Sequence, residues 1–387
     1  MEIPFASSPT SSLGIEWEIQ LVDRASRELV SAASPILAAL SEKLGDEAAA
    51  KAKHELFEST IEVVTGVCST VEEATADLAG TVALVRDLAD ARGVGLMCAG
   101  THPTSRYADQ RISPLPRYAA LVERLRWLAE RLLIFGVHVH VGVRSPAKAV
   151  PVVNALSAYI PHFLALSGSS PYWLGQDTGL ASTRSTIFEI LPTAGLPYPL
   201  EDWAAFERLM ETFITAGAIE TIREIWWDIR PHPDFGTVEL RICDGLPTVR
   251  EVGAVAALTQ CLVERMDSQL DRGYTLPAPP RWLVAENKWR AIRHGLDAEI
   301  IVDERGTTRP VRDDIADLVE DLLPVARRLS CARDLVRVLT ILETGASCER
   351  QRAAARAGGG ALDGVVDTLL EEMDAGQPLP RPKANNG

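Results

Sequence analysis

Apolar and polar residues alternate strictly along residues 13–22, which read LGIEWEIQLV. An alternation with a period of two is typical of a β-strand that has one buried face and one polar face. The polar face carries Glu16 and Glu18, whose carboxylates are expected about 6.5–7 Å apart along the strand. That spacing suits two neighbouring magnesium ions, or ions on either side of a phosphate. The alternative interpretation is a polar face in contact with solvent.

A second alternation covers residues 53–64 and predicts another strand with carboxylates on its polar face. Glu58 and Glu62 share that face, and Glu55 lies just before it, where we expect a bend. Like charges on adjacent strands repel each other unless cations lie between them. Two strands with acidic faces in one chain therefore favour a metal cluster.

A third strand is predicted over residues 135–143, which read FGVHVHVGV. Its valines alternate with His138 and His140, so both imidazoles should project from the face opposite the buried valines. Neutral imidazoles on one sheet face bind metals or polyphosphates, or they transfer protons. The alternative is a pair of half-exposed histidines on an ordinary strand.

Residues 237–242 alternate in the same way and predict a fourth strand of this kind. Glu239 and Arg241 share its polar face, and Arg230 lies close by in the sequence. A carboxylate can ligate a metal while a guanidinium next but one to it contacts a phosphate or a carboxylate. A cross-strand salt bridge is the competing interpretation.

Between these strands, residues 167–184 form a long segment rich in Gly, Ser and Thr. Long polar loops are unusual unless they bind something, so this one is interpreted as a substrate loop. Thr178, Ser182 and Arg184 are its expected substrate contacts, although no phosphate-loop motif is present. His102, in an earlier loop, either contacts a ligand or caps its own loop.

Helical periodicity and capping signals account for most of the remaining chain. The segment 145–167 is expected to break near Pro161, and 286–295 is a short basic stretch. On that stretch Asn287 and Arg290 recur at helical spacing and are assigned to the nucleotide. The predicted helices are 34–44, 70–92, 118–134, 145–167, 200–216, 248–270, 286–295, 312–329, 330–342 and 361–373.

Composition narrows the class of protein. The 387 residues are 47% hydrophobic and carry a formal net charge of −14, so a large core is possible and a nucleic-acid-binding surface is not expected. The six scattered cysteines include no Cys-x-x-Cys pair and are expected to be reduced. We expect no signal peptide and no apolar stretch long enough to cross a membrane, which together indicate a soluble, cytoplasmic protein.

Several of these segments, taken together, resemble the YbdK-type carboxylate-amine ligases, the type 2 glutamate-cysteine ligase group. The matching residues run in order through nearly the whole chain. They are GIEWEIQLVD (14–23), ESTIEVVT (58–65), GTHP (100–103), FGVHVHVG (135–142), DTGLASTR (177–184) and WDIRPHPDFGTVELR (227–241).

The resemblance implies an α+β, glutamine-synthetase-like fold, in which a curved antiparallel sheet carries the active site on its concave face and helices back it. It also implies ATP, Mg²⁺ (or Mn²⁺), amide bond formation and a homodimer. The implied metal ligands are Glu16, Glu18, Glu58, Glu62, His138 and Glu239. The implied nucleotide and phosphate contacts are His140 and Arg241, and the resemblance leaves open which of His138 and His140 binds the metal. Arg184 or Arg230 is implied to bind the substrate carboxylate or phosphate, so that both join Arg241 as expected catalytic residues, and Glu55 is expected beside the substrate in the same cluster.

We therefore expect one catalytic domain over residues 13–373, after a loose lead-in (1–12) and before a disordered tail (374–387). The favoured hypothesis is an ATP-dependent ligase that forms an amide through an acyl phosphate, with glutamate and cysteine as the first substrates to consider. The alternatives are a phosphotransferase similar to guanidino kinases, and a non-catalytic protein that binds a nucleotide or another ligand.

Overall fold

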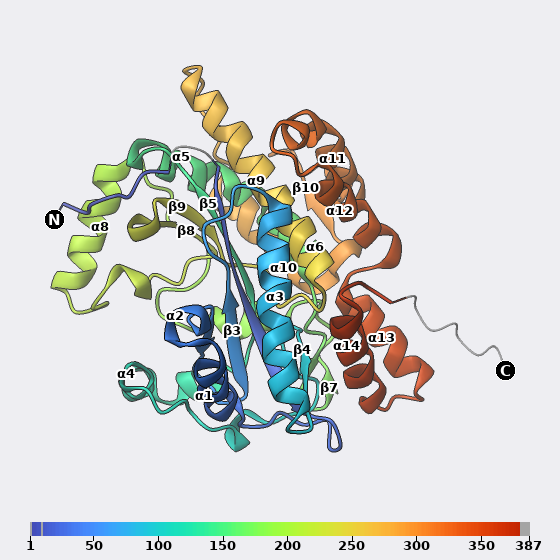
Figure 1. Ribbon diagram of the computed structural model, residues 1–387. Coiled ribbons are helices and arrows are strands. Elements are labelled where there is room, and N and C mark those ends of the chain that lie inside the picture. The colour runs from blue at the N-terminus through green and yellow to red at the C-terminus, as the bar shows by residue number, and fades with distance from the viewer. Residues whose placement is uncertain (1, 9–10, 380–387) are drawn as a thin grey trace.

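A seven-stranded antiparallel sheet forms the centre of the molecule (Figure 1). It is seen in a computed structural model that describes residues 2–8 and 11–379. The strand order is β2-β3-β1-β5-β9-β8, and β4 pairs with the second half of β1. The strands are β1 (Leu13–Asp23), β2 (Ala52–His54), β3 (Thr60–Val64), β4 (Val94–Met97), β5 (Val137–Gly142), β8 (Ile229–His232) and β9 (Thr237–Leu240).

One face of this sheet enters the main hydrophobic core. Ile15, Trp17 and Ile19 of β1 are almost fully buried there, as are the valines of β5. The helices α3 (Val71–Asp90) and α9 (Val249–Asp271) pack on one another beside the sheet (Figure 1). Because side chains alternate across a strand, the polar residues of β1 and β5 must lie on the other face. The alternation seen in the sequence is thus confirmed as strand structure.

The remaining helices surround this core (Figure 1). Two further short strand pairs, β6–β7 (Tyr172–Trp173 and Gln176–Asp177) and β10–β11 (Glu299–Ile301 and Thr308–Pro310), lie outside the main sheet. The other helices are α1 (Ala33–Leu44), α2 (Asp46–Ala49), α4 (Pro116–Leu125), α5 (Pro146–Leu156), α6 (Ile160–Ser167), α7 (Thr183–Phe188), α8 (Trp203–Thr215), α10 (Arg281–His294), α11 (Val311–Arg328), α12 (Ala332–Thr344), α13 (Ser347–Ala357) and α14 (Asp363–Ala375).

Local capping explains where α3 begins. The side chain of Thr70 accepts a hydrogen bond from the backbone N–H of Glu73, and the carboxylate of Glu73 bonds back to the N–H of Thr70. This reciprocal pair is the capping box that the sequence predicted, and it satisfies donors that the first helical turn leaves free.

Two of the predicted elements end or divide at places that the sequence did not indicate. The single strand expected over 53–64 is divided into β2 and β3, because the chain turns between them and leaves Glu55 at the bend. The helix expected over 118–134 ends at Leu125, where Arg126 adopts a positive φ of 51° and a 3₁₀ segment follows. The break expected near Pro161 is confirmed: the segment 145–167 is interrupted at 157–159, and Pro161 lies in the first turn of α6, where a missing N–H costs little.

The stretch Pro146–Ser167 also corrects the expectation that no segment is long enough to cross a membrane. Its 22 helical residues are long and apolar enough, by length and composition alone, to cross a membrane. However, 78% of its apolar part is buried inside the protein. The stretch contains α5 and α6, which pack against α9 and α10 respectively. A buried core helix of this kind gives only weak support for a membrane span.

The two ends of the chain are more ordered than expected wherever they are described. The backbone N–H of Ala6 donates to Pro233 O (3.0 Å), and that of Ser8 donates to Val143 O (3.1 Å). At the other end, α14 continues to Ala375, inside the tail predicted to be disordered, while residues 380–387 lie outside the described part. All six cysteines are buried free thiols, as the sequence predicted.

Candidate active site

Strand register assembles one row of charged side chains across the polar face of the sheet. The residues that face one another directly come from neighbouring strands, so no long-range loop is needed to bring them together. The opposed pairs are Glu18 with Glu62, Glu16 with His138, His140 with Glu239, and Glu239 with Arg230.

Three overlapping groups in this row have the donor set of a cation site. In each group, three ligand atoms lie within 4.8 Å of one another, a separation that a single ion can bridge. The groups are Glu16–Glu62–His138, Glu16–His140–Glu239 and Glu18–Glu55–Glu62.

The carboxylates at one end of the row repel one another. Burial and the neighbouring Glu55 raise the pKa of Glu18 to about 8. Burial, followed by the charges of Glu55 and Glu16, raises the pKa of Glu62 well above its ordinary value. Closely spaced carboxylates are stable in the ionised form only when a cation neutralises them. These residues therefore fit a divalent cation with oxygen ligands.

His140 offers a nitrogen that is oriented but not used. Its Nδ1 lies 3.0 Å from Thr237 Oγ1, which fixes the ring. Its Nε2 is buried and has no hydrogen-bond partner among the described residues, although it lies 3.4 Å from Glu16 Oε1 and 3.9 Å from Glu239 Oε1. A histidine that is held through one ring nitrogen and presents the other beside carboxylates has the arrangement of a metal ligand.

His138 lies one pair along the same strand. Its Nδ1 is 3.0 Å from Glu16 Oε2. Burial, helped by the positive charge of Arg241, lowers the pKa of His138 to about 4, so the ring is neutral at physiological pH and can bind a cation. Burial acts to raise the pKa of Glu16, but His138 and His140 beside it lower that pKa well below its usual range. Glu16 is therefore an anion shared by both histidines.

Two guanidiniums close the opposite end of the row around Glu239. Arg230 Nε lies 2.7 Å from Glu239 Oε2, and Arg241 Nη1 contacts the other carboxylate oxygen. Burial acts to raise the pKa of Glu239, but Arg230 and Arg241 lower it well below its ordinary value. Arg230 also donates to the carbonyls of Arg223 and Ile225 (both 2.8 Å), so its donors are occupied. Arg241 Nε has no partner in the described chain and remains available.

Known proteins are similar to this chain over nearly its whole length. The family model described as "Glutamate-cysteine ligase family 2 (GCS2)" matches residues 12–372. The chain belongs to glutamate–cysteine ligase family 2. A protein of Frankia alni with the provisional name glutamate–cysteine ligase 2-1 is 72% identical over 98% of this chain and 99% of its own. A relative from Thermobifida fusca, provisionally named glutamate–cysteine ligase 2, is 57% identical over 98% and 94%.

Solved structures show the same fold at low sequence identity. A glutamate–cysteine ligase from Francisella tularensis, in complex with AMP, matches with a TM-score of 0.70 at 14% identity, covering 98% of this chain and 91% of that one. A bifunctional glutathione synthetase from Pasteurella multocida matches with a TM-score of 0.67 at 13% identity, covering 94% and 52%. These likenesses confirm the expected α+β, glutamine-synthetase-like class.

Several of the expected site residues lie outside the cluster, beginning with Glu58 and His102. Glu58 falls in the turn before β3, where its carboxylate accepts hydrogen bonds from the hydroxyl (2.7 Å) and the backbone N–H (3.3 Å) of Ser34 at the start of α1. His102 is completely buried, and its Nδ1 accepts from the N–H groups of Thr104 (3.2 Å) and Ser105 (3.0 Å). His102 thus has the loop-capping role that the sequence left open.

The residues predicted for the nucleotide on α10 are engaged elsewhere. The amide of Asn287 exchanges two hydrogen bonds with the backbone of Ile301 (2.7 and 2.8 Å), which fixes β10. Arg290 Nε lies 2.9 Å from the Glu286 carboxylate on its own helix. The residue of α10 that approaches the sheet is Lys288, whose ammonium is buried between Asp228 and Glu189.

The polar side chains of the loop assigned to substrate are held by hydrogen bonds within the loop and to the segment that follows β9. Thr178 Oγ1 donates to Pro171 O (3.0 Å). Ser182 is the N-cap of α7, and its hydroxyl donates to Asp244 (2.7 Å). Only 3% of the surface of Arg184 is exposed, and its guanidinium donates to backbone carbonyls instead of facing solvent.

The sequence reasoning missed an aromatic pair beside His140. His232 and Phe235 stack with ring centroids 4.2 Å apart, and both rings approach His140 edge-on. Phe235 is 56% exposed, so the pair extends the site toward solvent at the β8–β9 turn. The spacing in the sequence could have indicated this. His232 lies two residues after Arg230, so both side chains project from the same, polar face of the strand.

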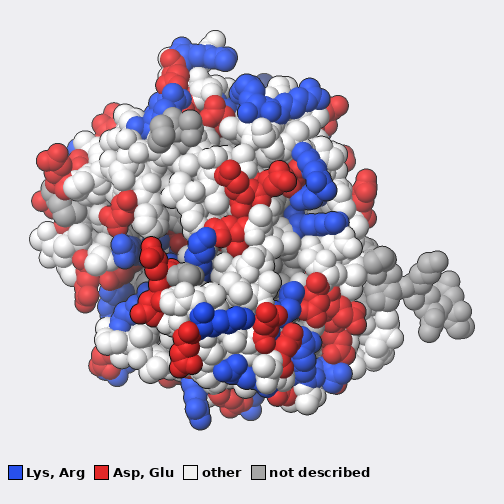
Figure 2. Space-filling view, viewed as in Figure 1, with Lys and Arg blue, Asp and Glu red and all other residues white. Residues whose placement is uncertain are grey.

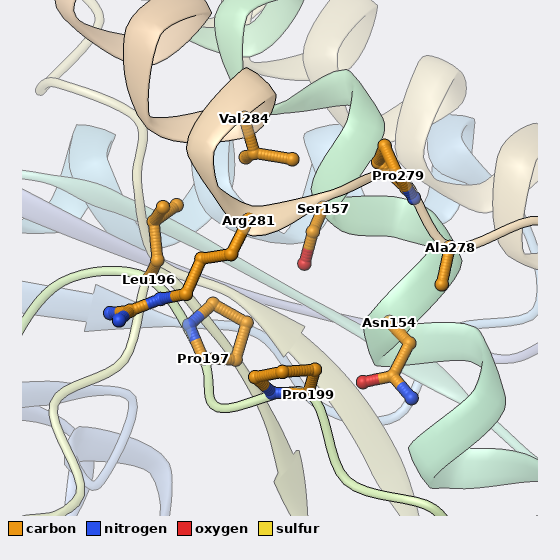
Figure 3. A pocket seen from close by; sticks show the side chains of 9 residues that line it. All are labelled: Asn154, Ser157, Leu196, Pro197, Pro199, Ala278, Pro279, Arg281 and Val284. Atoms are coloured by element: carbon orange, nitrogen blue, oxygen red, sulfur yellow. The ribbon is translucent and has the colours of Figure 1, made fainter. Parts of the chain in front are cut away.

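The cavity in Figure 3 is separate from the cluster. It is a small space, with a volume of about 30 Å³. None of the cluster residues lines it. Its walls are Asn154, Ser157, Leu196, Pro197, Pro199, Ala278, Pro279, Arg281 and Val284. On the face seen in Figure 2, basic and acidic side chains are interspersed rather than gathered into one basic surface.

Proposed function

We propose that this protein is an ATP-dependent carboxylate–amine ligase that works through an acyl phosphate. The observation that carries the proposal is the single row of carboxylates, imidazoles and guanidiniums across one sheet face. The membership of the family and the fold shared with a glutamate–cysteine ligase in complex with AMP support it.

The chemistry explains why such a row is needed. An oxygen of the substrate carboxylate attacks the γ-phosphorus of ATP, the bond to the bridging oxygen breaks, and ADP leaves. The amine nitrogen then attacks the acyl carbon, loses its proton and expels inorganic phosphate. The transferring phosphoryl group is a crowded anion, so positive charge beside it lowers the barrier.

The residues of this chain divide that work. Glu16, Glu18, Glu55, Glu62, His138, His140 and Glu239 supply the donors of the three groups and would hold Mg²⁺, or Mn²⁺, which tolerates imidazole better. Bound there, the cation would neutralise phosphate oxygens. Arg241, with a free Nε and a position beside Glu239, would contact the transferred phosphate. Arg230 would hold Glu239 in place, since its own donors are occupied.

The first substrates to consider are glutamate as the acid and cysteine as the amine, which would give γ-glutamylcysteine. The names of the relatives support that choice. We place the enzyme in the cytoplasm as a soluble homodimer with one catalytic domain over residues 13–373, and light scattering of the purified protein tests the dimer.

The decisive experiment measures ADP release from the purified protein with ATP and Mg²⁺, across a panel of carboxylic acids and amines, with mass detection of products. We expect turnover that requires both an acid and an amine, and an amide product. Accumulation of a stable phosphorylated product without an amine would instead indicate a phosphotransferase.

Variants of the row test whether the turnover belongs to this site. Glu16→Gln should abolish Mg²⁺-dependent ATP binding while the fold is kept. The matched control is Glu73→Gln, which alters an exposed carboxylate that belongs to the α3 capping box and not to the row. Unchanged ATP binding in Glu16→Gln would overturn the assignment of the site.

A further inference from the structure

The segment that follows β9 continues to pair with the β5 side of the sheet, but it contains one more residue than its partner. Paired residues run in register from Gly142–Thr237 to Val139–Leu240, and the strands meet again at the bridge between Gly136 and Asp244. Between the last two pairs, the β9 side advances by four residues while the β5 side advances by three. One residue too many on one strand is a β-bulge, and bulges change the direction of nearby side chains.

The carbonyls of this bulge are bound by Arg184. Its Nη2 donates to Arg241 O and its Nη1 donates to Ile242 O, each at 3.2 Å. Its Nε makes no hydrogen bond within the described residues, so these two carbonyls are its hydrogen-bonded contacts through the side chain. A buried guanidinium that binds consecutive carbonyls fixes the backbone between them.

Gly136 leaves the space in which that guanidinium lies. A Cβ added at Gly136 would collide with Arg184 Nη2. The main chain of Arg184 is fixed as well, because its N–H donates to Ser170 Oγ (3.0 Å) and Ser170 Oγ donates to Asp244 (2.6 Å). Asp244 is the residue that ends the bulge, so Arg184 is tied to the bulge through both its backbone and its side chain.

This arrangement fixes the carbonyl of Arg241 and, with it, the orientation of the Arg241 side chain. Its backbone N–H donates to Asp228 O (2.8 Å), and its side chain reaches Glu239 in the charged row. We propose that Arg184 is a positioning residue that fixes the bulge at 241–243 and acts on the reaction through Arg241, without contacting the substrate. This inference rests on the proposed function, in which Arg241 contacts phosphate.

A double-mutant cycle separates this role from direct contact. The variants are Arg184→Gln, Arg241→Gln and the double substitution, and the measurement is Mg²⁺–ATP affinity by calorimetry, with ADP release where turnover persists. Arg184→Gln alone should weaken binding roughly 5- to 20-fold, since a misplaced contact is lost. In the Arg241→Gln background, the further loss should fall below about threefold, because the two residues act as one unit.

Independent, multiplying losses would show that Arg184 contacts the ligand itself and would overturn the inference, as would unchanged affinity in Arg184→Gln. If Arg184→Gln does not fold, the cycle is run with Arg184→Lys, which keeps the charge but cannot bind both carbonyls. Arg312→Gln is the matched control, because Arg312 also donates to a backbone carbonyl, Leu342 O (2.6 Å), on the α11–α12 pair; its affinity should be unchanged.

The two proposals fail in different ways. A wild-type protein that binds no Mg²⁺–ATP would overturn the proposed function. Multiplying losses in a wild-type protein that does bind it would overturn only the positioning role of Arg184. A general loosening of the fold would lower the melting temperature and weaken both backgrounds equally, and it would also count against the positioning role.

Discussion

Glu18 and Glu62 face each other directly across the β1–β3 ladder. Like charges in this position are destabilising, and in both residues the pKa is raised, to about 8 for Glu18. A chain that places two carboxylates opposite one another in a half-buried sheet needs a proton or a cation between them. The protonated form and the cation-bound form therefore compete for the same pair.

That competition predicts that Mg²⁺ affinity rises with pH. The raised pKa values mean that Glu18 and Glu62 bind protons in the cation-free protein, and these protons must leave when the cation binds. Affinity should increase by up to about tenfold per pH unit for each proton released, as the pH rises toward 8. Calorimetry in buffers of different ionisation enthalpy measures both the affinity and the protons released.

The control for this prediction is Glu62→Gln, which removes one of the two carboxylates. It should weaken Mg²⁺ binding and reduce the number of protons released, while raising the melting temperature of the cation-free protein because the repulsion is gone. A Mg²⁺ affinity that does not change with pH in the wild type would show that the pair is not part of the cation site.

Strand periodicity was enough to predict most of the charged row. Glu16, Glu18, Glu62, His138, His140 and Glu239 lie on strands whose alternation is visible in the sequence, and a period of two assigns their face without any tertiary information. Arg230 was not predicted in this way, because β8 was not predicted as a strand. Glu58 shows the limit of that argument, because it has the parity of Glu62 but the strand begins only at Thr60. Glu58 lies in the turn before β3, and its carboxylate accepts a hydrogen bond from the hydroxyl of Ser34 instead.

Side chains that bind distant backbone could not be predicted in the same way. Asn287 has helical spacing suited to an anion, yet its amide binds Ile301, fourteen residues along the chain. Arg184 lies in a polar loop, yet it is buried against carbonyls that follow β9. Such contacts depend on which segments the fold brings together, and a local pattern carries no information on that.

The pairing of Arg230 with Glu239 predicts a large cost for a conservative substitution. Arg230→Lys keeps the charge but cannot donate to the carboxylate and to the carbonyls of Arg223 and Ile225 together. We expect a loss of about 2–4 kcal/mol in the free energy of unfolding, measured by chemical denaturation. Arg223→Lys, at an exposed pair with Asp234, should change that free energy by less than about 0.5 kcal/mol. Equal effects in the two variants would contradict the structural role.

Burial of His102 predicts a stability that falls in mild acid. Burial lowers the pKa of His102 from 6.5 to about 3, so the unfolded chain binds a proton that the folded chain excludes. The stabilising contribution is complete above pH 6.5 and is lost progressively as the pH falls toward 3. Between about pH 7.5 and about pH 5 the loss should be about 2 kcal/mol.

His102→Asn is the variant that tests this. An asparagine oxygen can accept from Thr104 and Ser105 in place of Nδ1, and it does not titrate. The melting temperature of the wild type should fall further than that of His102→Asn when the pH is lowered over that range. Parallel curves for the two proteins would mean that His102 is protonated in the folded state or does not contribute.

Asn287 provides the clearest separation between a binding role and a structural one. Asn287→Ala leaves the N–H and the C=O of Ile301 without their side-chain partners beneath a largely buried helix face. Unpaired buried backbone groups cost about 1–3 kcal/mol each, so the free energy of unfolding should fall by about 2–4 kcal/mol. Because the amide of Asn287 binds β10 and no member of the charged row, Mg²⁺–ATP affinity should stay within about twofold of the wild type. A variant that keeps its stability but loses affinity would return Asn287 to the nucleotide site that its helical spacing first indicated, so denaturation and calorimetry on the same preparation decide between the two roles.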